Sequence, residues 1–153
     1  MAEFEVVRVS KSSEMAEALS IRRRVFIEEQ AVPEELEIDE HDGNPALVSS
    51  ARHVLVRLDG VAVGTGRLLL EPDEHGHIHI GRVAVLAENR RHGVGRAVMT
   101  ALHDLARQEG IDSITLAAQT HAIGFYERLG YVLRPGDIFL DAGIEHRWMD
   151  LRL

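Results

Sequence analysis

Residues 90–96 read RRHGVGR and stand between an apolar, alternating stretch and a helical pattern. A helix N-terminus carries unpaired backbone N–H groups and the positive end of the helix dipole, and glycines there let an anion come close. Arg90, Arg91 and Arg96 place positive charge at a helix end where cations are unfavourable unless an anion binds. The segment predicts an anion site; the simpler alternative is an ordinary strand-to-helix turn with solvated arginines.

The spacing within this segment narrows the choice of anion. No Gly-Lys-Ser or Gly-Lys-Thr follows, which excludes a P-loop, and Val98 occupies the position of the third glycine in the dinucleotide fingerprint. What remains is an Arg-x-x-Gly-x-Gly pattern from Arg90 to Gly95, preceded by the apolar stretch GRVAVL.

Three histidines, His75, His77 and His79, alternate ahead of this stretch and would project from one face if all three lay in one strand. An imidazole titrates near neutral pH, so a histidine here suits a general base. The same run could instead ligate a metal ion, which would indicate a metal-binding protein, or could be solvated. The sequence leaves these alternatives open.

Residues 28–42, EEQAVPEELEIDEHD, form a dense acidic segment. Its carboxylates are a second set of candidate bases, or could attract a cationic substrate to an acidic entrance. In most such clusters the majority of the carboxylates are solvated surface. The candidates are Glu28, Glu29, Glu37 and Asp39.

The hydrophobic pattern alternates between period 2 and period 3.6, which is typical of an α/β or α+β fold. The expected strands cover 3–9, 77–86, 112–119 and 144–153, with a hairpin over 52–71 that turns at Asp59-Gly60. The expected helices run from Ser12 or Ser13 to about Glu29, from Val94 to Gly110, and over 121–130.

The composition limits the class of protein. The chain has 153 residues, 45% of them hydrophobic, and a formal net charge of −8. A chain of this length buries roughly two-thirds of its unfolded surface, so we expect a single domain over residues 1–153. The absence of cysteine excludes disulfides and thiolate catalysis, and the negative charge argues against nonspecific nucleic-acid binding. No apolar run approaches about 18 residues, so we expect a cytoplasmic protein with no membrane segment; a homodimer is left open.

GRVAVL followed by RRHGVG resembles the acetyl-CoA signature of the GCN5-related N-acetyltransferase (GNAT) family, and FYERLGY at 125–131 resembles that family's second landmark. The likeness extends over nearly the whole chain. It implies an α/β (α+β) GNAT fold, with a single mixed central sheet of about six to seven strands flanked by helices. In that fold two central parallel strands splay apart and acetyl-CoA, the co-substrate, lies in the gap.

A finer resemblance lies in the N-terminal half. RRRVFIEEQAVPEELEIDEHD is similar to the pattern of a bacterial branch known mostly as uncharacterised, YjcF-like proteins, and AQTHAIGFYERLGY and GIEHRWM agree with that branch. Acyl-homoserine-lactone synthases share a more distant version of this pattern, but this chain lacks the tryptophan that the likeness would place downstream of the phenylalanine. The resemblance assigns the acceptor, an amine that an acidic entrance would favour in cationic form, to Arg24, Phe26, Glu29, Gln30, Glu37 and Asp39.

The resemblance also implies how acetyl-CoA binds. Backbone groups of Val83 and Val85 would hold the pantetheine arm, and the amides of residues 91–96 the pyrophosphate. The residues assigned to acetyl-CoA are Val83, Ala84, Val85, Arg90, Arg91, His92, Gly93, Val94, Gly95, Arg96, Gln119, Ala122 and Phe125.

Acetyl transfer to an amine needs a neutral amine, a polarised thioester carbonyl and a proton for the leaving thiolate. Tyr126 is the predicted general acid, because a phenol suits a thiolate of comparable basicity. His79 stands six residues before Val85, where some family members carry a catalytic glutamate, and is the predicted base. The expected function is acetyl transfer from acetyl-CoA to a primary amine by direct attack in a ternary complex. The alternative is a non-catalytic acetyl-CoA-binding module.

Overall fold

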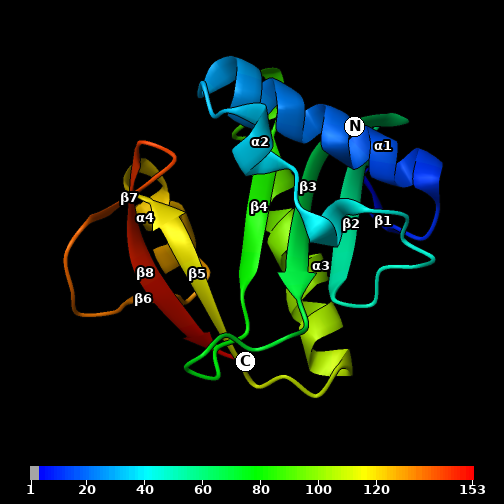
Figure 1. Cartoon of the computed structure of the whole chain (residues 1–153). Coiled ribbons are helices and arrows are strands. Elements are labelled where there is room, and N and C mark those ends of the chain that lie inside the picture. Colours follow the sequence, from blue (N-terminus) through cyan, green and yellow to red (C-terminus); the bar gives the residue numbers. More distant parts are fainter. Residues whose placement is uncertain (1–3) are drawn as a thin grey trace.

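The computed structural model describes residues 4–153, which form a mixture of strands and helices (Figure 1). The strands are β1 (Phe4–Arg8), β2 (Ala51–Leu58), β3 (Val61–Leu69), β4 (Ile80–Val85), β5 (Ser113–Gln119), β6 (Val132–Leu133), β7 (Phe139–Asp141) and β8 (Ile144–Arg152). The helices are α1 (Ser12–Arg22), η1 (Arg23–Glu29), α2 (Glu34–Glu37), η2 (Glu40–Asp42), η3 (Ala87–Asn89), α3 (Val94–Gln108), η4 (Thr120–Ala122) and α4 (Ile123–Arg128). Within residues 4–153 no helix is long and apolar enough to cross a membrane.

Strands β1 to β4 form an antiparallel sheet in the order β1-β2-β3-β4. The β2–β3 hairpin turns at Asp59 and Gly60, whose φ angles of 50° and 83° belong to a tight two-residue turn. The predicted hairpin is therefore confirmed. The predicted first strand is confirmed as β1, although its residue 3 lies outside the described residues.

Helix α3 packs directly on β3 because two glycines leave room for it. A Cβ on Gly66 would stand 2.8 Å from side-chain atoms of Val98 and Leu102, and one on Gly64 would stand 2.6 Å from Val94 Cγ1. Real Cβ atoms do not approach this closely, so a larger residue at either position would push the helix away. The contact holds the N-terminus of α3 beside the end of β4.

The remaining strands form a second sheet in the order β5-β8-β6, with β7 paired to β8. One isolated parallel bridge, between His79 and Thr115, joins it to β4, and the Thr115 N–H donates to the Ile78 carbonyl at 2.9 Å. Beyond this bridge β4 and β5 diverge, as Figure 1 shows. The expected splay between two parallel strands is confirmed, but it divides the strands into two sheets of four rather than leaving a single sheet of six to seven.

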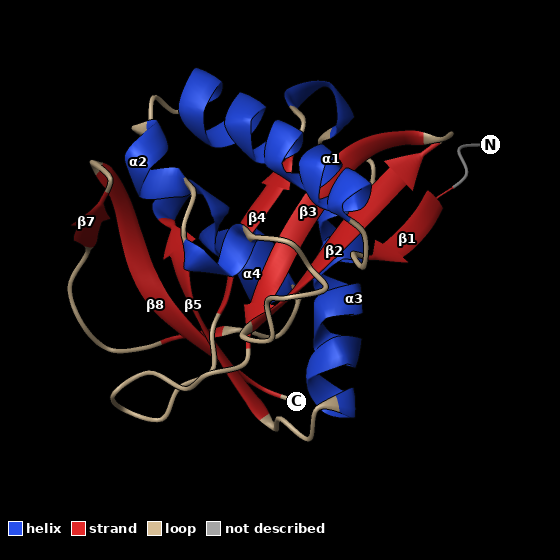
Figure 2. Ribbon diagram, turned by 45° about the vertical axis from the view of Figure 1, so that its right-hand side comes forward, coloured by secondary structure: helices blue, strands red, loops and turns tan. Residues whose placement is uncertain are grey.

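The helix predicted from Ser12 or Ser13 to Glu29 is present but changes form at Arg23, where α1 gives way to the π-helix η1. Its N-cap is Lys11, and the Glu14 carboxylate accepts the backbone N–H groups of Ser10 and Lys11 at 2.9 and 3.2 Å. The Glu14 carboxylate thus caps the N-terminus of α1, a role that the sequence analysis gave to a serine. Figure 2 shows α1 lying across the first sheet, with α2 and the β7 hairpin at one end of the molecule.

Candidate active site

The loop before α3 has the geometry of an anion site. Gly93, at the N-cap, has a φ angle of 83°, and Arg91 has a φ angle of 69°, so the loop curls and leaves the first-turn amides of α3 facing outward. A Cβ on Gly95 would stand 3.1 Å from Phe125 Cζ, so glycine leaves room for the Phe125 ring beside the first turn of α3. Arg91 and Arg96 are exposed and form no ion pair within residues 4–153. Their charge is available to an external anion.

Arg90 plays a different part from its two neighbours, because its guanidinium is already bound. Nη1 and Nη2 donate to the Glu29 carboxylate at 2.7 and 2.8 Å, and Nε donates to the Val85 carbonyl at 3.0 Å. These hydrogen bonds hold the pKa of Glu29 below its ordinary value. Arg90 therefore supports the loop, and Glu29 holds Arg90 instead of standing free as a base.

Strand β4 carries a bulge that the sequence analysis did not predict. Thr65 pairs with Ala84 but Arg67 pairs with Gly81, so an extra residue of β4 is accommodated between them, and Arg82 has a φ angle of 51°. An isolated glycine inside a strand pattern, Gly81, was the available signal. The bulge lies on the part of β4 that faces the gap.

Two side-chain amides form a hydrogen-bonded pair beside the gap between β4 and β5. Gln30, at the end of η1, and Gln119, at the end of β5, exchange two hydrogen bonds of 3.1 and 2.9 Å across 89 residues of chain. Together with the Glu29–Arg90 pair, this contact ties the end of η1 to both diverging strands. Sequence analysis assigned Gln30 to the acceptor and Gln119 to acetyl-CoA; the structure brings them into direct contact.

Tyr126 lies in α4, next to the end of β5, and only 9% of it is exposed. Its ring packs edge-on against Phe125 and Tyr131, with centroids 5.0 and 5.8 Å away. Burial raises the pKa of Tyr126 to about 12, so the phenol stays protonated at neutral pH. Within residues 4–153 its hydroxyl has no hydrogen-bond partner, so it is available as a donor to a ligand.

His79 lies at the bridge where the two sheets meet. Its Nε2 is 2.7 Å from Asp73 Oδ2, and its ring stands edge-on to Trp148, with centroids 5.6 Å apart at 85°. Asp73 also accepts the backbone N–H groups of His75 and His77, and these three hydrogen bonds hold its pKa below the ordinary value. A carboxylate on Nε2 leaves Nδ1 as the free nitrogen of a neutral His79. Neither Asp73 nor Trp148 was given a role from sequence.

The three histidines do not lie in one strand, which was the condition for their sharing a face. Strand β4 begins at Ile80, and His75 and His77 lie in the preceding turn, which Asp73 caps. Only His79, through its bridge to Thr115, takes part in the sheet. Among the described residues no group of three histidine or acidic side chains is arranged to hold a metal ion.

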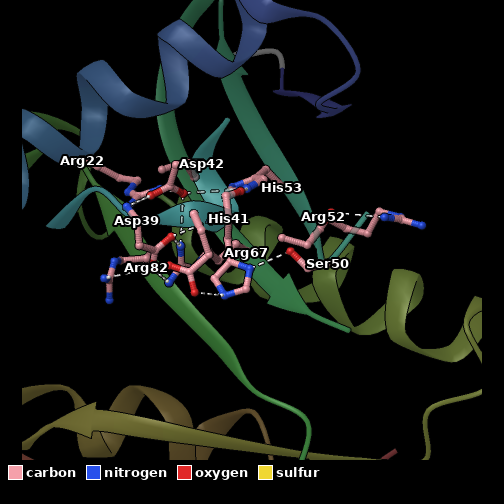
Figure 3. A network of polar contacts seen from close by, with 12 residues as sticks. Arg22, Asp39, His41, Asp42, Ser50, Arg52, His53, Arg67 and Arg82 are labelled. Carbon is pink, nitrogen blue, oxygen red and sulfur yellow. Dashed lines mark hydrogen bonds and ion pairs between the residues drawn. The ribbon is translucent and has the colours of Figure 1, made fainter. Parts of the chain in front are cut away.

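The buried carboxylates of the acidic segment are bound by arginines of the fold (Figure 3), while Glu28, Glu35 and Glu40 are exposed. Arg22, 1% exposed, donates to Glu37 at 2.7 Å and to both oxygens of Asp42 at 2.6 and 2.9 Å. Arg67 binds both oxygens of Asp39 at 2.8 and 2.7 Å, and Asp42 at 3.1 Å. Glu37 and Asp39, predicted to bind the acceptor, are thus held by cations of the fold.

The arginines of this network shift the pKa values of its carboxyl groups. Burial alone would raise the pKa of Asp42, but hydrogen bonds and charge from Arg22 hold it below the ordinary value. Burial raises the pKa of Glu37, with the Arg22 charge opposing the rise. Arg82, from the bulge of β4, lies 3.3 Å from Glu37 Oε2 and donates to backbone carbonyls of α2. The network therefore fixes α2 over β4.

The other predicted acceptor residues are also engaged. Arg24 donates to Glu88 at 2.9 Å, and Phe26 belongs to the hydrophobic core. Glu28 is exposed. The single feature that sequence reasoning missed most completely is Arg22, whose partners lie 15 and 20 residues further on in the Glu-x-Asp-x-x-Asp pattern.

The split sheet, with its glycine and arginine loop at the gap, is the arrangement of an acyltransferase fold. A model of the acetyltransferase (GNAT) family matches residues 15–131, and the chain belongs to that family. It is 36% identical over 146 residues to the uncharacterised N-acetyltransferase YjcF of Bacillus subtilis, covering 95% of this chain and 98% of that one. This relationship agrees with the YjcF-like branch inferred from the N-terminal motifs.

Solved structures share the fold. An acyl-CoA N-acyltransferase from Pseudomonas aeruginosa matches with a TM-score of 0.78 and 28% identity, over 97% of this chain and 98% of that chain. The PaiA N-acetyltransferase of Thermoplasma acidophilum, solved in complex with coenzyme A, matches with a TM-score of 0.73 over 99% of each chain. Its 14% identity makes it a likeness of fold alone.

Proposed function

We propose that this chain transfers the acetyl group of acetyl-CoA to a primary amine, as one N-acetyltransferase domain spanning residues 1–153. The observation that carries the proposal is the loop before α3, at the end of the gap where β4 and β5 are furthest apart. The loop has outward-facing backbone amides, glycines at positions 93 and 95, and two arginines, Arg91 and Arg96, that form no ion pair within residues 4–153. This chemistry fits a pyrophosphate, because charge-assisted hydrogen bonds from amides and guanidinium groups are what phosphate oxygens accept best.

The edge of β4 fits the pantetheine arm. The Val85 carbonyl accepts Arg90 instead of a β3 partner, so it lies on the open edge of the strand. In a strand the N–H and C=O of one residue point the same way, and the Val85 N–H therefore faces the gap as well. An N–H in this position suits the oxyanion of acetyl transfer. Val83, inside the bulge, extends the same edge.

Two side chains carry the protons. The neutral amine attacks the thioester carbon, and its proton passes to Nδ1 of His79, whose other nitrogen is held by Asp73. As the C–S bond breaks, the Tyr126 hydroxyl protonates the thiolate. The sequence has no cysteine to form a thioester intermediate, which favours direct attack. A screen of amines, read by release of the free CoA thiol, tests the proposal as a whole.

Replacing Gly95 by valine is expected to weaken acetyl-CoA binding by at least about tenfold, because the added side chain covers the amides of α3 and presses on Phe125. Calorimetry with acetyl-CoA measures the change. Thr100→Val, at an exposed position of the same helix, is the matched control and should bind normally. A folded Gly95→Val protein with the parent affinity would refute the pyrophosphate site.

Replacing His79 by alanine is expected to lower the rate of acetyl transfer by about 10² and to remove the acidic limb of the pH–rate profile. Only an unprotonated imidazole can accept the amine proton, so the parent rate should fall toward acidic pH. His75→Ala, whose side chain is 73% exposed, is the control and should keep both rate and limb. If both variants kept the parent profile, His79 would not be the base.

A further inference from the structure

An aromatic surface surrounds His79 on the α2 side of the splay. Ala117 of β5 lies opposite Trp148 of β8, and Phe139 of β7 lies opposite His146 of β8. Residues directly opposed in an antiparallel pair project from the same face, and alternation along β8 puts both pairs on one face. His79 meets that face edge-on at Trp148. We call this surface the aromatic face: His79, Gly81, Ala117, Phe139, His146 and Trp148.

The aromatic face has room for a ligand beside His79. Gly81 follows His79 by two residues, so it lies on the same face of β4, opposite Arg67. A Cβ built on Gly81 would meet no atom within 4 Å. His79, Gly81, Ala117, Phe139 and Trp148 are all partly exposed, which leaves the space open to solutes.

The rings of this face offer little to a cation. Phe139 stacks on both His146 and Trp148, with centroids 5.7 and 4.9 Å apart and interplanar angles of 23° and 25°. The Arg134 guanidinium already lies over the Trp148 ring, 5.8 Å from its centroid. Ring faces attract cations whereas ring edges carry positive charge. Stacking with Phe139 and the Arg134 guanidinium thus already occupy the Trp148 ring.

The two carboxylates that contact His79 and Arg134 are already paired. Asp73 is held by His79, and both oxygens of Asp150 are held by Arg134, at 2.7 and 3.0 Å. Nearer the first sheet, Glu37, Asp39 and Asp42 are held by Arg22 and Arg67. A second ammonium placed directly beside His79 would therefore meet carboxylates that already hold a partner, and its desolvation there is costly.

We propose that the acceptor binds on the aromatic face and is a primary amine with an apolar, aromatic arm, not a polyamine. The proposal rests on the N-acetyltransferase function above and names its substrate class. The reacting nitrogen faces His79, and the arm packs over Gly81 and Ala117 against the edges of Phe139 and Trp148. Edge-to-face contact with those rings favours an aromatic arm over an alkyl arm of equal area.

Trp148 is the single tryptophan of the chain, so its emission reports on this face directly. The protein with CoA is titrated with 2-phenylethylamine and, separately, with spermidine. We expect 2-phenylethylamine to change the Trp148 emission saturably, with a dissociation constant at least about tenfold lower than that of spermidine, a difference of about 1.4 kcal/mol. Spermidine binding as tightly as 2-phenylethylamine, or more tightly, would overturn the proposal, as would no response to either amine.

The variant Gly81→Val tests whether the amine binds beside Gly81. The position has open space and a φ angle outside the left-handed range, and valine suits a strand, so the fold should tolerate it. We expect at least about tenfold weaker 2-phenylethylamine binding, with acetyl-CoA affinity unchanged. Ala46→Val, in an exposed loop, is the control. Equal amine binding in Gly81→Val and parent would contradict the assignment.

These readouts separate the two proposals. Emission and calorimetry measure binding and need no turnover. Loss of acetyl-CoA binding in the parent, or absence of thiol release with every amine, would reject the proposed function whatever the Trp148 response. A parent that acetylates spermidine at least as efficiently as 2-phenylethylamine would keep the function and reject the aromatic acceptor.

Discussion

Tyr126→Phe is expected to lower kcat for acetyl transfer by about 10² or more, with acetyl-CoA affinity nearly unchanged. The ring keeps its edge-on contacts with Phe125 and Tyr131, so packing survives the loss of the oxygen. What is lost is a hydroxyl whose burial raises its pKa to about 12 and which is therefore protonated throughout the working range. Steady-state kinetics and calorimetry with acetyl-CoA measure the two quantities.

Tyr131→Phe is the matched control for this substitution. It removes the same atom from a neighbouring buried ring, but the Tyr131 hydroxyl is already bonded to His103 Nε2 at 2.7 Å. We expect a loss of stability of about 1 kcal/mol and no change in kcat. Equal losses of kcat in both variants would indicate a general packing effect and remove Tyr126 from the mechanism.

Arg22→Ala is expected to lower the free energy of unfolding by about 3–5 kcal/mol, because it leaves Glu37 and Asp42 buried without their main cation. Urea denaturation at neutral pH measures the loss. The neighbouring Arg23, 49% exposed in an exposed pair with Glu34, is the control, and Arg23→Ala should cost less than about 1 kcal/mol. A folded Arg22→Ala protein with parent stability would show that the network does not stabilise the fold.

The loss should depend on pH with a definite sign. In the parent the folded pKa of Asp42 is depressed, so its contribution is present above the unfolded pKa of about 4 and is lost as the pH falls. Without Arg22, burial raises the pKa of both carboxyls in the folded state, and they take up protons on acidification. The difference between parent and variant should therefore be larger at pH 7 than near pH 4.5.

Local patterns predicted most of the fold. The Asp59-Gly60 turn and the apolar stripe of α3 each depend on neighbouring residues, and both are confirmed. No local pattern marks the change to a π-helix at Arg23, and the β4 bulge at Arg82 has only the isolated Gly81 as a local signal. The predicted strand 77–86 begins too early, because the Asp73 carboxylate accepts the backbone N–H of His77 and holds that residue in a turn. Strand β4 begins at Ile80.

The residues of the candidate site also fall into those that local sequence predicts and those that it does not. The glycines and arginines of the α3 loop and Tyr126 are adjacent in sequence to the elements that position them, so their places were predictable. The Gln30–Gln119 pair and the contact of Asp73 with His79 depend on how strands meet. Charge counting misread the acidic segment, since composition does not show that Arg22 and Arg67 would be folded into it.

The divergence of β4 and β5 leaves two unpaired strand edges facing each other inside one molecule. Unpaired edges are templates for β-pairing with other chains and are a common route to aggregation. Here the Gln30–Gln119 and Glu29–Arg90 contacts brace η1 between the free ends of both strands, where an invading strand would have to enter. The fold thus keeps an open hydrogen-bonding edge for a slender ligand while shielding it from other polypeptides.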